Sequence, residues 1–456
     1  SRIDALVCRT PADPTVALRA MAPTGVAWIE CRRGWREAWR VRRAVTRSLL
    51  EVRAVYWLLP DARHARRYVP LQHRGAVRWY LSRLLVPRSR PERLAAWLLG
   101  RVPALAHLLP GGIGVVAAGP RAGRGSAALD SHLELDEGDA LLVQSSGHDA
   151  GNRTIVVPFG TGGRLEGSVV KVASRWAGDD TTDAEFATLQ ALHEVLPVDL
   201  ASSVPEPLDR WEWSGRRVTR ETMFDGPTVA QAVGSGDADP VATLRAVTDW
   251  LTAFHRATAD DADWSEARAA YVDSVFAAYQ TVGPDDPEVA RLLARASARS
   301  HELIGAPFPD VRRHYDLTPS NVILGAGGLG VIDWEPGLGR APDGRGPAVC
   351  DLDYFAKFWM HVVADARDLD DELRLFAHLP GEVCAQARAA VLTYCDALGI
   401  DRRFVPWLTV YHWVEQALAD HRRAARLGGL PAERQKAVHY VQALSRTQDR
   451  LFSLDP

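Results

Sequence analysis

Three polar side chains with a defined spacing lie in the stretch HYDLTPSNVILGAGGLGVIDWE, residues 314–335. Asn321 begins one short apolar run, NVIL, and Asp333 ends the next, LGVID, with GAGG between them. Two such runs predict a β-hairpin, which brings Asn321 and Asp333 to the same end. An amide and a carboxylate side by side are ligands that Mg²⁺ accepts, while Asp316, just before them, can take a proton from a hydroxyl. The alternative is that Asp316 and its neighbours only form turns.

The same stretch resembles the aminoglycoside phosphotransferase family of small-molecule kinases, whose usual string is HGDLxPxNxL followed by a strand ending in IDW or IDF. This resemblance implies an α+β, bilobal, protein-kinase-like fold, with a small β-rich N-lobe and a large, mostly helical C-lobe. It implies Asp316 as the catalytic base and Asn321 and Asp333 as ligands of Mg²⁺. It also implies that His314 and Asp351, the latter in PAVCDLDYF, support the catalytic loop.

A kinase needs a strand lysine that holds the phosphates of ATP and an acidic partner for that lysine on the next helix. The chain has only three lysines, and Lys171 lies inside the apolar run SVVKVAS. We expect Lys171 to contact the nucleotide and Glu185, in DAEFATLQAL, to be its partner, with Glu194 as the alternative. The other interpretation is that Lys171 is an ordinary lysine at a strand edge and Glu185 a solvated residue of a helix face.

The phosphate-covering loop is expected one hairpin before the lysine strand, where the chain reads SSGHDAGNR. This position assigns Ser145, Ser146 and Gly147 to phosphate contact through backbone N–H groups and hydroxyls. The glycine-rich GTGGRLEG then forms the next turn. By fold analogy, RETMF receives adenine, with Met223 near its centre.

Two residues are candidates for the acceptor site. Tyr315 replaces the usual glycine of the family, and its ring should shape the acceptor site unless it turns into the core. Glu335 closely follows Asp333. An acidic residue there would suit a cationic acceptor such as an aminoglycoside.

The elements that must position these residues suggest three regions: a basic N-terminal region at 1–125, a kinase N-lobe at 130–225 and a kinase C-lobe with the acceptor site at 226–456. Residues 1–127 have 23 arginines, no lysine and 7 acidic residues, a net charge of +16, whereas the remainder has a net charge of −19. In the basic region, LRAMAPTGVAWIE (Leu18–Glu30) predicts a helix end, a Pro-Thr-Gly turn and a strand, and SLLEVRAVYWLLP (Ser48–Pro60) predicts another strand. This order is typical of α/β structure and resembles the later half of a class I methyltransferase. It lacks the glycine-rich cofactor turn of that family, so we expect no methyl transfer.

We therefore expect an ATP- and Mg²⁺-dependent phosphotransferase that acts on a hydroxyl of a small molecule, such as an aminoglycoside, a sugar, or another antibiotic or metabolite. ATP versus GTP, the identity of the acceptor, and resistance versus biosynthesis stay open. A protein kinase is disfavoured because D-F-G and A-P-E strings are absent. The alternative is a pseudokinase, a nucleotide-binding module tethered to a basic membrane- or partner-binding region.

The remaining expectations concern partners and location. The Arg-, Trp- and Leu-rich residues 78–109 could lie on an anionic membrane, although core-facing helices are the commoner origin of such a pattern. We expect no nucleic-acid partner. Five scattered cysteines without a C-x-x-C pair fit a reducing cytoplasm.

Overall fold

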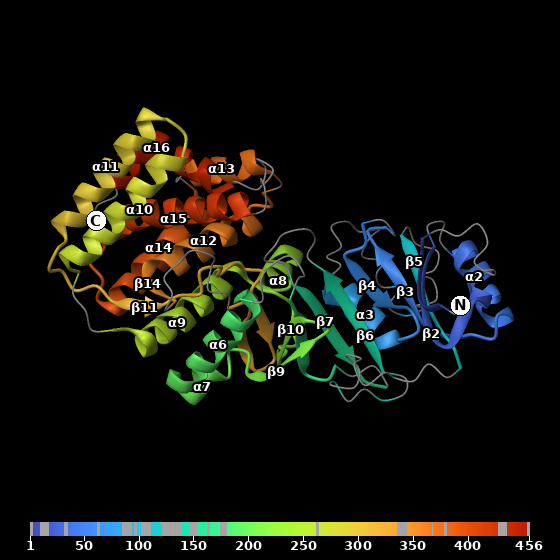
Figure 1. The fold of residues 1–456 in the computed structure, drawn as a ribbon. Coiled ribbons are helices and arrows are strands. Elements are labelled where there is room, and N and C mark those ends of the chain that lie inside the picture. Colours follow the sequence, from blue (N-terminus) through green and yellow to red (C-terminus); the bar gives the residue numbers. More distant parts are fainter. Residues whose placement is uncertain are drawn as a thin grey trace. The chain divides into compact units, whose positions relative to one another are not determined.

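A ten-stranded sheet runs through the first of two units into which the chain divides in the computed structural model (Figure 1). The first unit comprises Ser1–Asp183 and Pro207–Met223, and the second comprises Ala184–Glu206 and Phe224–Pro456. Each is described by itself. The structure describes residues 3–9, 18–31, 35–61, 64–83, 94, 98–99, 101, 111–120, 133, 136, 139–145, 153–161, 165–173, 180–260, 264–334, 344–366, 368–377, 381–426 and 436–453.

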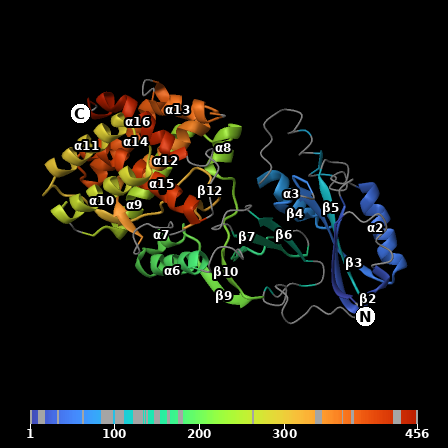
Figure 2. The ribbon, with the colours of Figure 1, turned by 45° about the horizontal axis from the view of Figure 1, so that its top comes forward.

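The sheet of the first unit has the strand order β1-β2-β5-β3-β4-β6-β7-β8-β10-β9, which can be followed in Figure 2. Its strands β1 and β2 are parallel, and all other neighbouring pairs are antiparallel. The strands are β1 (Ile3–Arg9), β2 (Met21–Cys31), β3 (Glu51–Leu59), β4 (Arg67–Pro70), β5 (Gly112–Ala118), β6 (Ala140–Ser145), β7 (Thr154–Phe159), β8 (Ser168–Val172), β9 (Pro207–Trp213) and β10 (Arg216–Thr222).

The predicted boundary near residue 125 does not interrupt this sheet. Strand β4 of the basic region pairs with β6, with Arg67 opposite Gln144 and Tyr68 opposite Val143. This pairing covers β6, which would otherwise be an edge strand with unpaired backbone groups. The division into three regions is therefore not visible as a break in the strand pairing, and it stays a prediction.

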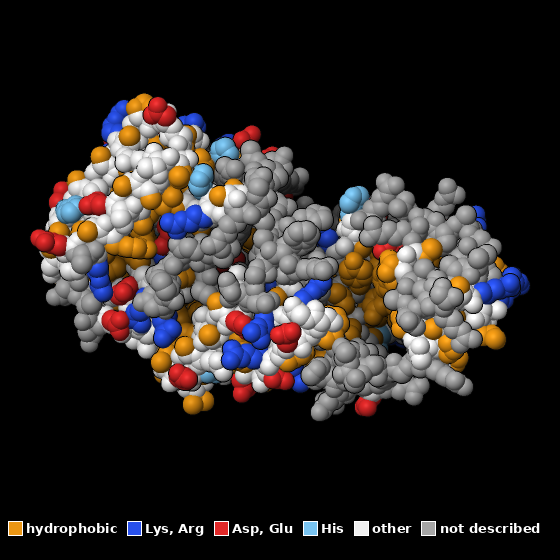
Figure 3. All heavy atoms as spheres, in the orientation of Figure 1, with side chains coloured by type: hydrophobic (Ala, Val, Ile, Leu, Met, Phe, Trp, Pro, Cys, Tyr) orange, Lys and Arg blue, Asp and Glu red, His pale blue; other side chains and the backbone are white. Residues whose placement is uncertain are grey.

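Two helices of the first unit, α2 (Trp35–Arg47) and α3 (Arg74–Arg83), cover the sheet. The buried side of α2 has Ala38, Val41 and Val45. Its arginines are exposed, and basic side chains are visible over α2 in Figure 3. Most of residues 84–109 lie outside the described residues, so membrane contact there stays a prediction. Among the described residues, no helix is long and apolar enough to span a membrane.

In the residues that the structure describes, the second unit is mostly helical and has two short two-stranded sheets. Helix α6 begins just before it. The helices are α6 (Asp180–Val195), α7 (Val198–Ala201), α8 (Val229–Ser235), α9 (Pro240–Thr258), α10 (Glu266–Val282), α11 (Pro287–Glu302), α12 (Val349–Val363), α13 (Leu369–Ala377), α14 (Glu382–Leu398), α15 (Phe404–Arg426) and α16 (Lys436–Ser453). The strands are β11 (Asp310–Arg312), β12 (Val322–Gly325), β13 (Gly328–Val331) and β14 (Arg345–Pro347). The predicted α+β class is confirmed.

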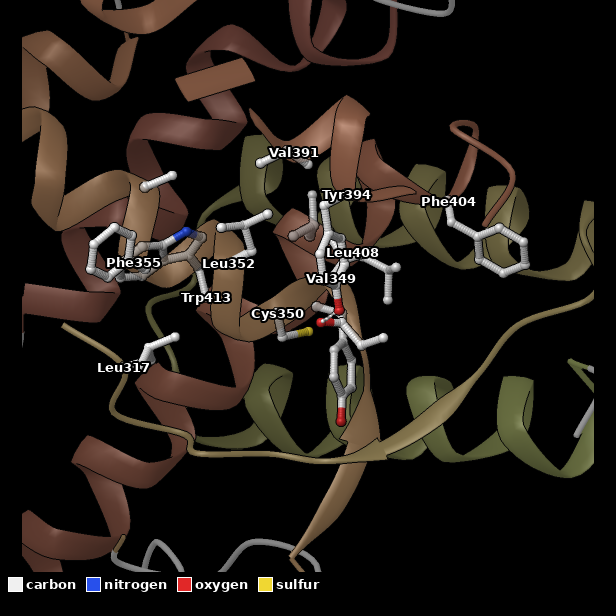
Figure 4. Packing of buried hydrophobic residues seen from close by; sticks show 14 of the residues in the cluster. Leu317, Val349, Cys350, Leu352, Phe355, Val391, Tyr394, Phe404, Leu408 and Trp413 are labelled. Carbon is white, nitrogen blue, oxygen red and sulfur yellow. Dashed lines mark hydrogen bonds between the residues drawn. The ribbon is translucent and has the colours of Figure 1, made fainter. Parts of the chain in front are cut away.

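The core of the second unit lies between its helices, and part of it is drawn in Figure 4. Helix α9 illustrates why these segments are helical. Asp239 caps its first turn by accepting a hydrogen bond from the Ala242 N–H at 2.7 Å, and Pro240 occupies the first helical position. Leu244, Val247, Leu251 and other apolar residues then follow at helical spacing and are buried.

The hairpin predicted around GAGG is present as β12 and β13, with Val322 opposite Val331. Gly330 lies on β13 where a Cβ atom would come within 2.4 Å of the Phe224 ring, so the hairpin needs glycine there. The Ile332 N–H donates to the Asn321 carbonyl at 2.9 Å, which extends the pairing by one step. The segment that ends in Asp333 is thereby fixed beside Asn321.

Candidate functional site

The loop from Arg313 to Asn321 connects β11 to the hairpin of the second unit, and it contains Asp316. The Asn321 side chain folds back on this loop. Its Nδ2 donates to the Asp316 carbonyl at 2.8 Å and to the Asp316 carboxylate at 3.1 Å. Asn321 therefore holds Asp316 in a fixed orientation, although five residues separate them in the sequence.

The same contacts leave oxygens that could bind a cation. Because Nδ2 of Asn321 faces Asp316, its Oδ1 atom points the other way, and no described residue donates a hydrogen bond to it. The half-buried Asp333 carboxylate likewise has no donor among the described residues. An amide oxygen and a carboxylate without protein donors fit Mg²⁺, whose remaining positions are usually taken by phosphates and water. Within the described ranges, no cluster of three or more His, Cys, Asp or Glu could hold a metal alone.

His314 and Asp351 link the loop to its surroundings. The buried His314 ring donates from Nε2 to the Ile332 carbonyl at 2.9 Å and accepts at Nδ1 from the Asp316 N–H at 3.3 Å. Asp351, in the first turn of α12, accepts from the backbone N–H groups of His314 at 2.6 Å and Tyr315 at 3.2 Å. Burial raises the pKa of Asp351, but the His255 ring 3.8 Å from its carboxylate, the Arg313 charge and the His314 N–H outweigh burial and hold that pKa far below its usual value.

Arg313 is the centre of a fully buried network that the sequence did not indicate as functional. Its guanidinium contacts Asp351 at 3.3 Å and Glu415 of α15 at 2.8 Å, and its Nη2 lies 3.3 Å from Nδ1 of His412. Burial lowers the pKa of Arg313, but the Glu415 and Asp351 charges raise it further than burial lowers it. The sequence gives little signal for this network, because Arg313 follows another arginine, Arg312, and its partner Glu415 lies 102 residues away.

The sequence left two alternatives for the Tyr315 ring, at the acceptor site or in the core. The ring lies in the core and is 1% exposed. Its hydroxyl donates to the Arg345 carbonyl at 2.6 Å, and the Arg313 guanidinium stacks on the ring at 4.3 Å. The expectation that this ring shapes the acceptor site is therefore wrong. The backbone explains why the family has glycine here: φ of Tyr315 is +67°, in the left-handed region.

In the first unit, Lys171 of β8 is buried and its Nζ lies 2.9 Å from Oε1 of Glu221 on β10. The sequence named Glu185 instead. Lys171 lies opposite Thr219 in the sheet, which makes Glu221 its diagonal neighbour on the same face. Side chains alternate between the two faces of the sheet along RRVTRET, so Glu221 could have been identified as the partner if the pairing register of β8 and β10 had been known. Glu185 is buried and Glu194 exposed on α6, and pairing of either with Lys171 stays a prediction.

The nucleotide-loop and hinge residues are described only in part. Ser145 ends β6, and its N–H donates to the Arg66 carbonyl at 2.6 Å, so this N–H is not available to a phosphate. The Ser145 hydroxyl contact stays a prediction. Ser146, Gly147 and Glu335 lie outside the described residues. The Met223 N–H donates to the Gly167 carbonyl at 2.8 Å, and the chain passes into the second unit directly after Met223.

Comparison with known proteins gives one family. The model of the phosphotransferase enzyme family, APH, matches residues 147–374, which is half of the chain. The match does not cover the basic region, whose likeness to a methyltransferase stays a prediction. No curated protein is similar enough to count as a match.

Several solved structures are distantly similar. A glucosamine kinase has 15% identity and a TM-score of 0.38 over 70% of this chain and 92% of its own. The amicoumacin kinase hAmiN has 14% identity and a TM-score of 0.41 over 67% of this chain and 88% of its own. An aminoglycoside phosphotransferase from Streptomyces rimosus, solved with ADP and streptomycin, has 14% identity and a TM-score of 0.34 over 66% of this chain and 94% of its own. Likenesses this low carry no argument about this chain.

The family match spans Lys171 of the first unit and the loop, hairpin and α12 of the second. Members of this family have a protein-kinase-like fold and use ATP with a divalent cation. The predicted family, fold class and enzyme class are thereby confirmed. The chain belongs to the phosphotransferase enzyme family and is a small-molecule kinase.

Proposed function

We propose that the chain transfers the γ-phosphoryl group of ATP to a hydroxyl of a small molecule, with Asp316 as the base. The acceptor hydroxyl loses its proton to the Asp316 carboxylate while its oxygen forms a bond to the γ-phosphorus. The bond from that phosphorus to the β–γ bridging oxygen breaks, and ADP leaves. Catalysis by positioning suits a loop whose carboxylate is already fixed by its own chain.

One observation carries this proposal: the Asn321 amide is oriented by Asp316, and neither its Oδ1 atom nor the Asp333 carboxylate has a donor among the described residues. Asn321 and Asp333 would hold Mg²⁺. When bound, Mg²⁺ neutralises phosphate charge. Lys171, kept in place by Glu221, would hold the phosphates of ATP. Contacts of Ser145, Ser146 and Gly147 with phosphate, and of Met223 with adenine, belong to the same proposal.

The acceptor class stays broad. The family match names no acceptor, so the choice follows the resemblance of the loop sequence to aminoglycoside phosphotransferases. Amino sugars and aminoglycosides are the first acceptors that we would supply. Glu335 is kept as a proposed acceptor contact, whereas Tyr315 is not.

The test is ATP consumption by the full chain with Mg²⁺ and a panel of such acceptors, compared between the wild type and Asp316→Asn. Loss of a positioned base should lower turnover by about 10²–10⁴-fold. Asp285→Asn is the matched control, because Asp285 is an exposed carboxylate of the same unit. Both variants should bind Mg·ATP by titration calorimetry as the wild type does.

The outcomes separate this proposal from the pseudokinase alternative. If the wild type binds Mg·ATP but no acceptor stimulates ATP consumption above the Asp316→Asn level, the catalytic assignment fails and a nucleotide-binding module remains. If Asp333→Asn binds ATP with an unchanged requirement for Mg²⁺, the metal assignment fails independently.

A further inference from the structure

Helix α2 of the first unit has a row of arginines on the side opposite its buried face. Ala38, Val41 and Val45 are buried on the side that packs on the sheet. Residues spaced by four, three and four positions lie in one line along a helix of 3.6 residues per turn. With this spacing, the row consists of Arg36, Arg40, Arg43 and Arg47. All four side chains are exposed, as is that of the neighbouring Arg42.

The positive charge of this helix is not neutralised by the part of the chain that the structure describes. Glu37 is the only acidic residue of α2. Arg36, next to it, has interactions with other groups and is not counted. Among the described residues, no carboxylate pairs with the remaining four arginines, Arg40, Arg42, Arg43 and Arg47. At least four guanidinium charges are therefore open to a partner.

The strands beneath α2 contribute few acidic groups, and those have other contacts. Strand β2 ends near Glu30, whose carboxylate accepts from the Trp28 ring N–H at 3.1 Å. Strand β3 begins with Glu51, which pairs with Arg53 at 3.0 Å. Strand β5 has no acidic residue. The sheet therefore does not provide counter-charges for the row.

Helix α11 of the second unit shows a different arrangement of the same residue type. Its three arginines are spaced four residues apart, and each pairs with a carboxylate at 2.8–2.9 Å. The pairs are Arg291–Glu288, Arg295–Asp449 and Arg299–Glu302. The arginine-rich composition of the chain thus does not by itself leave guanidinium groups without acids. The row of α2 instead suits a partner that presents many negative charges.

Two large apolar side chains of the same segment are exposed. Trp39 lies beside the row and is 56% exposed, and Leu49, two residues after α2, is 84% exposed. The φ angle of Leu49 is +60°, in the left-handed conformation that favours glycine after the end of a helix. A leucine in this position costs stability in water. An apolar environment for its side chain would offset that cost.

We propose that α2 docks on a membrane surface of anionic lipid. The guanidinium groups of the row contact the lipid phosphates. Trp39 and Leu49 enter the interfacial layer between the head groups and the hydrocarbon, where tryptophan is favoured. Because the apolar side of α2 is already buried on the sheet, no large apolar face is left to insert. Docking is therefore mainly electrostatic and reversible.

A nucleic acid, the other common polyanion, fits these residues less well. The Arg43 guanidinium lies over the Trp39 ring, 5.2 Å from its centre, and so covers one of the two faces on which a base would stack. Leu49 has no group that a nucleic acid recognises, whereas a lipid interface accepts it. The exposed apolar residues therefore favour lipid.

The docking surface is distinct from the features already described. It lies outside residues 78–109, the segment whose sequence suggested membrane contact. It also includes neither Lys171 nor any residue of the catalytic loop. The inference therefore goes beyond the proposed phosphoryl transfer and does not depend on it.

The test is co-sedimentation of the full chain with vesicles of phosphatidylcholine alone or with about one third phosphatidylglycerol, an anionic lipid. The wild type should sediment with the mixed vesicles and not with phosphatidylcholine alone. Binding should weaken as the salt concentration rises from about 0.05 M to about 0.5 M, because salt screens exposed charges.

Two triple variants with the same change in net charge locate the surface. Replacing Arg40, Arg43 and Arg47 by glutamine keeps good helix formers and should weaken vesicle binding by about 10²-fold, because each basic residue at an anionic surface contributes about fivefold. The matched control replaces Arg291, Arg295 and Arg299 of α11 by glutamine and should bind as the wild type does. Circular dichroism verifies that both variants are folded.

Two single variants test the apolar contacts. Trp39→Gln should weaken binding by about tenfold, as expected for removing a partly buried aromatic side chain. Leu49→Gly should also weaken binding, to a smaller extent. In the absence of lipid it should raise the midpoint of urea unfolding, because glycine adopts a φ of +60° without strain. A residue that only supports the fold would not show these opposite effects.

The outcomes distinguish the possible partners. Equal losses in the two triple variants, or no sedimentation of the wild type with anionic vesicles, would overturn α2 as a lipid-docking surface. Binding to a labelled oligonucleotide that the α2 variant removes, without binding to vesicles, would assign the row to nucleic acid and overturn the lipid. Unchanged vesicle binding in both single variants would overturn the insertion of Trp39 and Leu49.

Discussion

The open side of the catalytic loop and its buried side differ in how their polar groups are satisfied. On the buried side, the Arg313 guanidinium contacts Asp351 at 3.3 Å and Glu415 at 2.8 Å, and all three side chains are almost inaccessible. On the open side, Asp333 and the Asn321 Oδ1 atom have no donor among the described residues. Under the proposed function, the buried groups hold the loop and the open groups would bind the metal. Substitutions on the two sides should therefore separate stability from activity.

The largest effect is expected from Asp333→Asn, on the open side. A cation with one ligand fewer stabilises less transition-state charge, so turnover should fall by about 10³-fold. The midpoint of urea unfolding should not fall, because this carboxylate accepts no hydrogen bond from the part of the chain that the structure describes. A large loss of stability together with activity would contradict the division into two sides.

On the buried side, Arg313→Met should lower the free energy of unfolding by about 3–5 kcal/mol, because it leaves Asp351 and Glu415 buried without their cation. Urea titration followed by circular dichroism measures this. Arg402→Met breaks an exposed pair with Asp396 and serves as the matched control, with little change expected. If the two variants unfold alike, the buried network does not hold the loop.

A third prediction concerns pH and extends the buried side to His361, on the same helix as Asp351. Neither of its ring nitrogens has a hydrogen-bond partner among the described residues, and burial lowers its pKa to about 4. The unfolded state then binds more protons between about pH 6.5 and 4, so stability is full above pH 6.5 and is lost as the pH falls.

From pH 7 to 4 this residue alone should lower the free energy of unfolding by about 3 kcal/mol. His361→Leu should flatten the pH dependence of urea unfolding by that amount. His255, which is also buried with a lowered pKa, keeps part of the dependence in both proteins. His421→Leu, at an exposed position, is the control. An unchanged slope in His361→Leu would show that His361 is solvated in the folded protein.

The comparison also explains which features the sequence could predict. The loop, the hairpin and the convergence of Asn321 with Asp316 depend on residues close in the chain, so their spacing was sufficient. Glu221 required the register of β8 and β10, which spacing alone does not give. The pairing of β4 with β6, which commits the Ser145 N–H, joins segments more than 70 residues apart.

Tyr315 was the least predictable residue, because its direction depends on distant groups: the Arg345 carbonyl and the Gln416 side chain, which donates to the Tyr315 carbonyl at 3.2 Å. Because the family usually has glycine at this position, the sequence marked Tyr315 as unusual, but it did not predict whether the ring points into the core or into the acceptor site. A tyrosine at φ +67° bears about 1–2 kcal/mol of backbone strain. Its contacts in the core must offset this strain.

The smallest effect is therefore expected from Tyr315→Phe, which keeps the ring and its stacking on Arg313 and removes only the hydroxyl. Loss of the 2.6 Å hydrogen bond to the Arg345 carbonyl should lower the free energy of unfolding by about 1 kcal/mol. The KM values for ATP and for the acceptor should both stay unchanged, because the ring lies in the core. A change in acceptor KM alone would instead return Tyr315 to the acceptor site and place it on the open side of the loop.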